Sequence, residues 1–361
     1  MLLTTLSVVA ASALLDIAST NCSCSPFSGN MGGCCSGAMK DECSSAFSHH
    51  SCNSSTPVCC ASDFFTTCCS AGSACSGGCR NTLEGSCHCK TQPTSAAVGY
   101  NATAALHVLG FSAAAQCSSE AILAWNCTAC PAASPLESTN VTRADGHLAY
   151  VGYDAPLQRI QVVLRGSLSI QDWLNNLDFL KEEAYGAAGC TDCRVHRGFL
   201  GAFRSLQPGI EASVDALLLR YPHAKVAITG HSLGAAMATH AAIALGLVKG
   251  LDLDPVVYTF GQPRVGDPKF AAWFAARFGS WFRVVHWNDP VPHVPPADFG
   301  FQHVGREVWY DSPSDARIIC ADGTHGEDRD CSDSVAVALA IDDHFTYLGH
   351  PVVQCRPFGL V

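Results

Sequence analysis

Residues 225–242 place a short strand, a tight turn and a helix in immediate succession, and no other segment restricts the fold as strongly. The segment reads KVAITGHSLGAAMATHAA, with Ser232 inside the turn. A serine on so tight a turn adopts strained backbone angles, and Gly230 and Gly234 omit the side chains that would collide with the neighbouring strand and helix. A glycine-rich turn without chemistry is the alternative. The strand before the turn and the helix after it favour the presentation of Ser232 as a nucleophile.

The chain from residue 98 onward alternates between strand-like and helix-like segments. Four short β-branched or aromatic runs are predicted to be strands: Ile160–Leu164, Lys225–Thr229, Val256–Phe260 and Trp281–His286. Apolar residues recur at helical spacing at positions 210, 214, 217 and 218, and again at 270, 273, 274 and 278. Strands separated by helices imply a largely parallel sheet covered on both faces, so the expected fold class is α/β.

The cysteines divide the chain into two parts. Of the 22 cysteines, 14 lie between Cys22 and Cys89 and eight between Cys117 and Cys355. Residues 21–90 are rich in Ser, Gly and Cys with few aliphatic residues, so they predict a small disulfide-rich module. A thiolate metal module is the alternative, which an oxidising export route disfavours. Residues 91–97, TQPTSAA, have linker composition, and residues 98–361 form the expected main domain.

The first residues indicate export from the cell. Leu2–Leu15 is an apolar stretch too short to cross a bilayer comfortably, and small residues such as Ala18 follow it, which predicts a signal peptide over residues 1–20. No Lys or Arg precedes this stretch. Five Asn-x-Ser/Thr sequons agree with a secreted glycoprotein; they begin at Asn21, Asn53, Asn101, Asn126 and Asn140. No later segment is apolar enough to predict a transmembrane helix.

The charge balance excludes one class of partner. Twenty-one Lys and Arg residues face 31 Asp and Glu residues, for a formal net charge of -10. Nucleic-acid binding needs a surplus of basic residues, so no nucleic-acid partner is expected.

A serine hydroxyl needs a histidine as general base and a carboxylate that orients this histidine. In α/β hydrolases the chain order is serine, acid, histidine. Asp289 follows the strand-like run WFRVVH and is the favoured acid, although Asn-Asp-Pro is also ordinary turn chemistry and Asp267 and Asp298 stay open as alternatives. By order alone the base is one of five histidines: His293, His303, His325, His344 and His350. His344, in AIDDHFTYLG, lies far enough past Asp289 to reach back from a separate loop.

The main domain resembles the fungal-type class 3 triacylglycerol lipases, a family that also contains feruloyl esterases. The resemblance covers nearly all of residues 98–361. The matching segments are GFSAAAQC at 110–117, VVLRGSLSIQDWLNNLDF at 162–179, CTDCRVHRGF at 190–199, the turn at 230–234, FGQPRVGDPKFA at 260–271, NDPVPHVPP at 288–296 and the segment around His344. The resemblance implies that Ser232 is the nucleophile, Asp289 the acid and His344 the base.

The resemblance also implies an oxyanion hole beside Ser232. The N–H of Leu233 supplies one donor by its place after the nucleophile, and the family's second donor corresponds to Ser167 in LRGS. A serine that caps the following helix is a compatible alternative for Ser167.

The next segment, LSIQDWLNNL, spaces four apolar residues along one face of a short helix. They are Ile170, Trp173, Leu174 and Leu177. The spacing alone favours a buried core helix, whereas the resemblance implies a lid that covers the serine in water and contacts acyl chains when it opens.

The cysteines of the main domain match the family as well. The resemblance implies bridges Cys117–Cys355, Cys127–Cys130 and Cys190–Cys193, which leaves Cys320 and Cys331 to pair. Redox catalysis by the two C-x-x-C pairs is the rival interpretation, and it is disfavoured because neither pair lies at a strand-to-helix turn. The cysteine-rich extension has no counterpart in the usual lipases of this group.

The sequence therefore predicts a secreted serine hydrolase that cleaves acylglycerol esters at an oil-water interface, with no metal and no organic cofactor. A feruloyl or other cell-wall esterase is the alternative enzyme, with the cysteine-rich module as a carbohydrate anchor. A catalytically silent surface-binding protein is the alternative outside enzymes.

Overall fold

The computed structural model describes the short strands between Glu42 and Thr91, and residues 99–355 apart from 177, 312–316, 321–326, 336–337 and 339. The predicted signal peptide lies outside the described residues. The chain separates into two compact units, Met1–Thr91 and Gln92–Val361. No helix in the described ranges is long and apolar enough to cross a membrane.

In the described part of the first unit, six short strands form three antiparallel pairs. The pairs join β1 (Glu42–Ser44) with β2 (His49–Ser51), β3 (Val58–Ala61) with β4 (Thr66–Cys69), and β5 (Ser73–Cys75) with β6 (Cys89–Thr91). The register sets Cys59 opposite Cys68 and Cys75 opposite Cys89. That the cysteines of this unit form disulfides stays a prediction.

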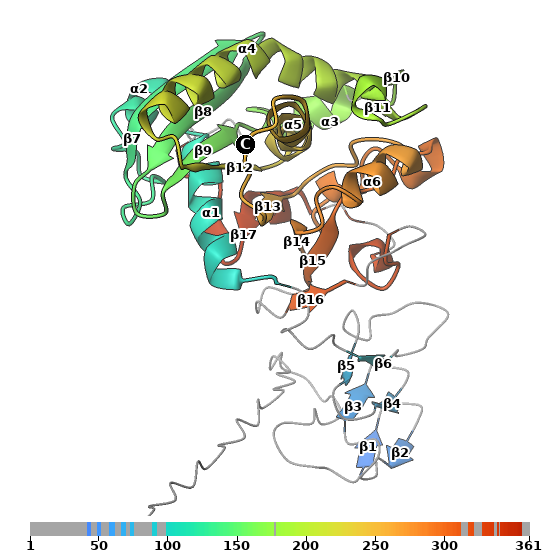
Figure 1. The fold of residues 1–361 in the computed structure, drawn as a ribbon. Coiled ribbons are helices and arrows are strands. Elements are labelled where there is room, and N and C mark those ends of the chain that lie inside the picture. The colour runs from blue at the N-terminus through green and yellow to red at the C-terminus, as the bar shows by residue number, and fades with distance from the viewer. Residues whose placement is uncertain are drawn as a thin grey trace, which may run out of the picture. The chain divides into compact units, whose positions relative to one another are not determined.

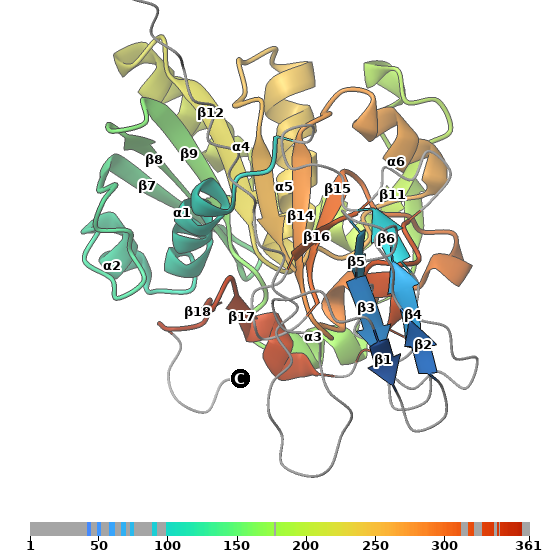
Figure 2. The same ribbon diagram turned by 90° about the horizontal axis from the view of Figure 1, so that it is seen from below.

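The second unit is built on a mixed sheet with a parallel centre (Figure 2). Its strands, in spatial order, are β7 (Leu136–Ala144), β8 (His147–Asp154), β9 (Arg159–Leu164), β12 (Lys225–Gly230), β13 (Val257–Phe260), β14 (Trp281–His286), β15 (Arg306–Tyr310) and β16 (Arg317–Ile319). β12 meets β13 through a parallel bridge between His231 and Phe260. The central strands β9, β12, β13, β14 and β15 are parallel to one another, whereas β7–β8, β8–β9 and β15–β16 are antiparallel pairs toward the two edges. The predicted α/β class is confirmed.

Helices cover both faces of this sheet, as the alternating strands and helices predict. The helix α1 (Ala102–Ala114) lies on one face, and α4 (Arg197–Arg220) and α5 (Leu233–Ala242) lie on the other (Figure 1). Successive side chains of β9 point to opposite faces of the sheet. Val162 and Leu164 pack on the face covered by α4 and α5, whereas Val163 packs on the face covered by α1. This period of two is the geometry of a strand with two buried faces.

The connections carry several shorter elements. They are α2 (Ser119–Leu123), α3 (Ile170–Asn176), β10 (Lys181–Glu183), β11 (Arg194–His196), the π-helix Ile243–Val248, α6 (Pro268–Ala275), β17 (Thr346–Tyr347), β18 (His350–Pro351), and 3₁₀ turns at Gly186–Ala188, Val291–His293, Ala297–Phe299, Ser332–Ser334 and Ile341–Phe345. The α4 helix is much longer than the predicted apolar run, because it begins directly after β11.

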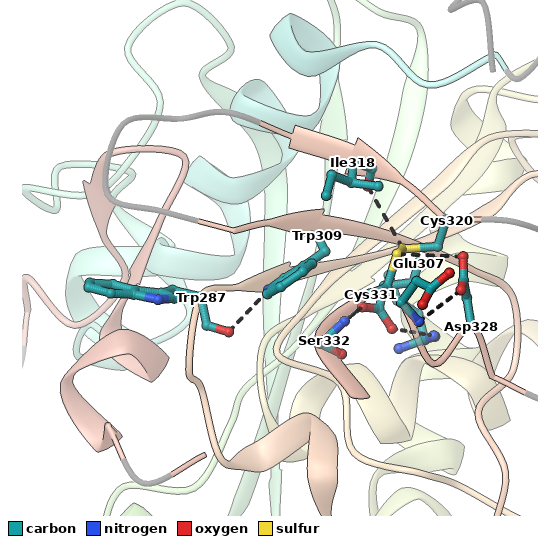
Figure 3. The surroundings of a disulfide bond; sticks show 10 residues. Trp287, Glu307, Trp309, Ile318, Cys320, Asp328, Cys331 and Ser332 are labelled. Carbon is teal, nitrogen blue, oxygen red and sulfur yellow. Dashed lines mark hydrogen bonds and ion pairs between the residues drawn. A yellow bond between two sulfur atoms is a disulfide. The ribbon is translucent and has the colours of Figure 1, made fainter. Parts of the chain in front are cut away.

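All four disulfides expected in the main domain are present: Cys117–Cys355, Cys127–Cys130, Cys190–Cys193 and Cys320–Cys331. The bridge between Cys320 and Cys331 packs beside Trp309 and Ile318, as Figure 3 shows. In the described part of the chain, two clusters of potential metal ligands occur, Cys117 with Cys127 and Cys355, and Glu307 with Cys320 and Cys331, but all of their cysteines are in these disulfides. A sulfur in a disulfide cannot act as a thiolate ligand.

Candidate active site

Ser232 lies at a sharp turn between β12 and α5. Its backbone angles are φ 61° and ψ −130°, outside the usual range for a non-glycine residue. Its N–H donates to the carbonyl of Phe260 at 2.9 Å, which fixes the turn against the next strand. A Cβ on Gly230 would lie 2.4 Å from the carbonyl carbon of Gly234, and a Cβ on Gly234 would lie 2.0 Å from Leu164 O. The predicted strain and the predicted need for both glycines are confirmed.

The close approach at Gly234 yields a stability prediction. Gly234→Ala is expected to lower the free energy of unfolding by about 3 kcal/mol, because the new methyl group would force the helix away from β9. Gly201→Ala is the matched control, since its Cβ would meet no atom within 4 Å on the exposed side of α4. The control is expected to raise stability by up to about 1 kcal/mol. Urea unfolding curves of the three proteins measure this difference, and equal midpoints for both variants would contradict it.

Asp289 and His344 form a direct, fully buried pair. Asp289 follows β14 in the turn before Val291, and His344 lies in the 3₁₀ turn Ile341–Phe345. His344 Nδ1 donates to Asp289 Oδ2 at 2.8 Å, and Val291 N donates to Asp289 Oδ1 at 2.8 Å. Both side chains have no exposed surface. The carboxylate therefore accepts a hydrogen bond on each oxygen and orients the imidazole.

The alternative acids have other contacts. Asp267 caps α6, where its side chain accepts from Phe270 N at 2.8 Å. Asp298 is exposed in the turn Ala297–Phe299. Of these three carboxylates, Asp289 is the one that contacts His344.

The alternative histidines also lie elsewhere. His303 Nε2 donates to Pro292 O at 2.8 Å, and burial with the nearby Arg283 charge lowers the pKa of His303 well below its usual value. Burial likewise lowers the pKa of His293. His350 is exposed on β18, and His325 lies outside the described residues.

The Ser232 hydroxyl and the His344 imidazole both lie at the carboxyl-terminal ends of β12 and β13. The residue after Phe260 is Gly261, and a Cβ there would lie 2.9 Å from His344 Cε1. The His231 ring, next to Ser232 in the chain, lies 4.4 Å from the His344 ring, and His231 Nε2 donates to His344 O at 2.8 Å. Ser232 Oγ and His344 Nε2 are both buried, and neither has a hydrogen-bond partner. Unpaired buried polar atoms are uncommon and mark sites of reaction or strain.

Comparison with known proteins shows the family of this chain. Residues 161–299 match the family described as lipase (class 3). The solved structure of the Rhizomucor miehei triacylglyceride lipase superimposes with a TM-score of 0.64 and 31% sequence identity, over 73% of this chain and 99% of that one. This chain belongs to the class 3 lipase family.

A lipase of Rhizomucor miehei is 37% identical over 231 residues, which is 62% of this chain and 62% of the relative. A secreted mono- and diacylglycerol lipase of Fusarium solani is 37% identical over 227 residues, 59% of this chain and 62% of the relative. The alignment therefore spans about three fifths of the length of these two relatives.

In this class 3 lipase chain, the loop after β9 lies directly against the serine turn. A Cβ on Gly166 would lie 2.8 Å from His231 O and 3.0 Å from Ser232 Cβ. This contact brings the backbone of the next residue, Ser167, close to Ser232. Leu233 is the first residue of α5, so its N–H has no carbonyl within the helix to bind. The loop that carries Ser167 therefore packs against the serine turn, and the roles of Ser167 and Leu233 as oxyanion donors stay predictions.

The capping alternative for Ser167 is wrong. The residue that precedes α3 is Ser169, whose Oγ accepts from Asp172 N at 3.4 Å and donates to Asp172 Oδ2 at 2.7 Å. Ser169 therefore caps α3, and Ser167 lies two residues before this cap.

The apolar face of α3 is buried at Ile170 and half-buried at Trp173 and Leu174. Ile170 is fully buried beside Val291 and Phe345, and Leu174 packs against the same cluster. Trp173 stacks on Phe199 with ring centroids 6.0 Å apart. Trp173 also lines a cavity of about 250 Å³ together with His147, Asp178, His196, Gly198, Phe199, Ala202 and Leu233. Leu177 lies outside the described residues. The amphipathic helix that the sequence predicts therefore borders a cavity beside the proposed oxyanion donor.

Arg264 is a residue whose importance the sequence does not reveal. Its guanidinium binds Glu327 through two nitrogens and contacts Asp333 Oδ1 at 2.9 Å. It also donates to the carbonyls of His293 at 2.7 Å and Pro295 at 3.3 Å. These carbonyls belong to the loop that follows Asp289, so Arg264 anchors the segment that carries the candidate acid. Arg264 lies in the segment FGQPRVGD, which belongs to the family resemblance. The segment alone does not show which residues the Arg264 side chain contacts.

Proposed function

We propose that this chain is a secreted serine hydrolase of acylglycerol esters, in which Ser232 is the nucleophile, His344 the base and Asp289 the acid. The observation that carries the proposal is the buried Asp289–His344 pair beside an unpartnered Ser232 hydroxyl on a strained turn. The names of the related lipases support ester hydrolysis.

The reaction that fits these groups is two-step acyl transfer. Ser232 Oγ attacks the ester carbonyl while His344 Nε2 takes its proton, and the same proton then passes to the leaving alcohol. A water activated by His344 attacks the acyl-enzyme and releases the acid. Asp289 holds the imidazole in place and stabilises its charged form. The N–H groups of Leu233 and Ser167 would bind the negative oxygen of each tetrahedral intermediate.

Secretion is part of the proposal. The Fusarium solani relative is described as secreted, and four disulfides in the main domain fit an oxidising compartment. Three sequon asparagines fall in the described part of the chain, and all three are exposed: Asn101, Asn126 and Asn140.

We expect α3 to act as a lid at a lipid surface. Trp173→Ala is expected to lower the rate on emulsified triacylglycerol about tenfold, because losing about 1.4 kcal/mol of lipid contact weakens binding by that factor. The rate on a soluble short-chain ester is expected to change less than about twofold. Asn175→Ala, on the exposed side of the same helix, is the control and is expected to leave both rates unchanged. Equal losses on both substrates would contradict a lid role for Trp173.

Two assays test the proposed function itself. An organophosphonate is expected to label Ser232 at one equivalent per chain, as detected by peptide mass, whereas a silent surface-binding protein would stay unlabelled. The second assay compares emulsified long-chain triacylglycerol, a phospholipid, a soluble short-chain ester and methyl ferulate. Turnover of methyl ferulate with none on the emulsion would favour the cell-wall esterase instead.

A further inference from the structure

A tyrosine hydroxyl contacts the candidate acid directly. Tyr347 lies on β17, three residues after His344, and has no exposed surface. Its hydroxyl donates to Asp289 Oδ2, the same oxygen that accepts from His344 Nδ1. With Val291 N on the other oxygen, three donors surround this buried carboxylate.

The local packing holds this hydroxyl in place. The Tyr347 ring makes edge contacts with Phe260 at 6.0 Å and His231 at 5.6 Å between ring centroids. Gly261 has φ +55°, and a Cβ there would lie 2.6 Å from the Tyr347 hydroxyl and 3.0 Å from His344 Nδ1. The missing side chain at Gly261 leaves the space in which both groups reach Asp289. A phenylalanine would fill the ring's volume, so Tyr347→Phe removes the contacts of the hydroxyl and keeps the packing of the ring.

We propose that Tyr347 is a positioning residue of the active site: its hydroxyl orients Asp289 and disperses the charge of this carboxylate, and thereby limits the basicity of His344. The inference rests on the proposed function. It assigns a role beyond the three candidate catalytic residues.

The electrostatics agree with a permanent donor. Burial and the charge of Asp289 raise the pKa of Tyr347 well above its usual value, so its hydroxyl stays protonated. The charge of Asp343 also acts on Tyr347 in the direction that raises the pKa of its hydroxyl, and Asp343 Oδ2 accepts from Asn288 N at 3.2 Å. The other titratable groups that face Asp289, His344 and Tyr347 are His231, His286 and His293.

Removal of the hydroxyl should change the pH profile in a defined direction. Without this donor the negative charge of Asp289 is less dispersed, so it stabilises protonated His344 more strongly and raises the pKa of that imidazole. His344 must be neutral to act as a base, so activity appears as pH rises through this pKa. A raised pKa therefore moves the acidic limb of the profile to higher pH.

Tyr347→Phe tests the proposal on a soluble short-chain ester. We expect kcat to fall about tenfold, KM to stay within about twofold, and the acidic limb of kcat/KM to move up by about half a pH unit. Tyr100→Phe is the matched control, because it removes another buried hydroxyl, one that bonds to Tyr310 at 3.0 Å. In Tyr100→Phe, the acidic limb of kcat/KM is expected to stay at its wild-type pH. If losing the hydroxyl only weakens the fold, the variant should have a lower melting temperature and an unchanged acidic limb of kcat/KM.

The outcomes separate the two proposals. If phosphonate does not label wild-type Ser232, the proposed function fails. If the wild type is labelled and Tyr347→Phe retains the wild-type pH limb, the role of Tyr347 fails and the proposed function stands. If the phenylalanine variant does not fold, Tyr347→3-fluorotyrosine keeps the hydroxyl and makes it a stronger donor, so the limb should move to lower pH. An unmoved limb in the fluorotyrosine protein would overturn the role of Tyr347.

Discussion

Ser232→Ala is expected to lower kcat on a soluble ester by a factor on the order of a million, while the protein stays folded. The variant loses the only hydroxyl on the strained turn, and His344 Nε2 then has no nucleophile to deprotonate. The turn itself is held by the Ser232 N–H bond to Phe260 O, which alanine retains. The loss should therefore appear in the chemistry rather than in the fold.

Active-site titration measures this effect. Wild-type protein is expected to release a burst of chromophore equal to one equivalent and to gain the mass of the phosphonate, and the alanine variant should do neither. Ser112→Ala is the control: Ser112 Oγ is buried against Thr229 Oγ1 at 3.1 Å, away from the imidazole. Its activity should stay within about twofold of wild type. Residual turnover in Ser232→Ala above about one thousandth of wild type would show that another residue attacks the ester.

Asp289→Asn is expected to lower kcat about ten-thousandfold. The amide keeps the size of the carboxylate but loses its charge, so it no longer stabilises protonated His344. Its NH₂ group would also compete with His344 Nδ1–H as a donor, which favours the wrong tautomer of the imidazole. Steady-state rates on a soluble ester measure this loss.

Asp298→Asn is the control for this change, because Asp298 is exposed on a different turn. It is expected to keep the wild-type rate within about twofold. The Asp289→Asn protein should still react with phosphonate at Ser232, far more slowly. A fall in kcat of less than about tenfold would remove Asp289 from the role of the acid and reopen the choice among the carboxylates.

The local elements could be predicted from the sequence. The strands β9, β12, β13 and β14 and the short helix α3 follow from residue type and spacing, because these features act over a few neighbouring residues. The edge strands were missed. β7, with the polar sequence LESTNVTRA, lies at the edge of the sheet and buries little, so it lacks an apolar pattern. β16 is only three residues long.

The sequence by itself determined the serine turn. A strand, a turn with two glycines and a helix in immediate succession restrict the backbone conformation at Ser232 to a tight strand-to-helix turn. It did not choose among the downstream carboxylates and histidines; the family resemblance pointed to Asp289 and His344. Only the tertiary structure decided that Asp289 bonds to His344, that Tyr347 shares the same carboxylate oxygen, and that Arg264 anchors the following loop. These contacts join residues many positions apart, and their geometry depends on strand order and loop closure, which no short-range pattern records.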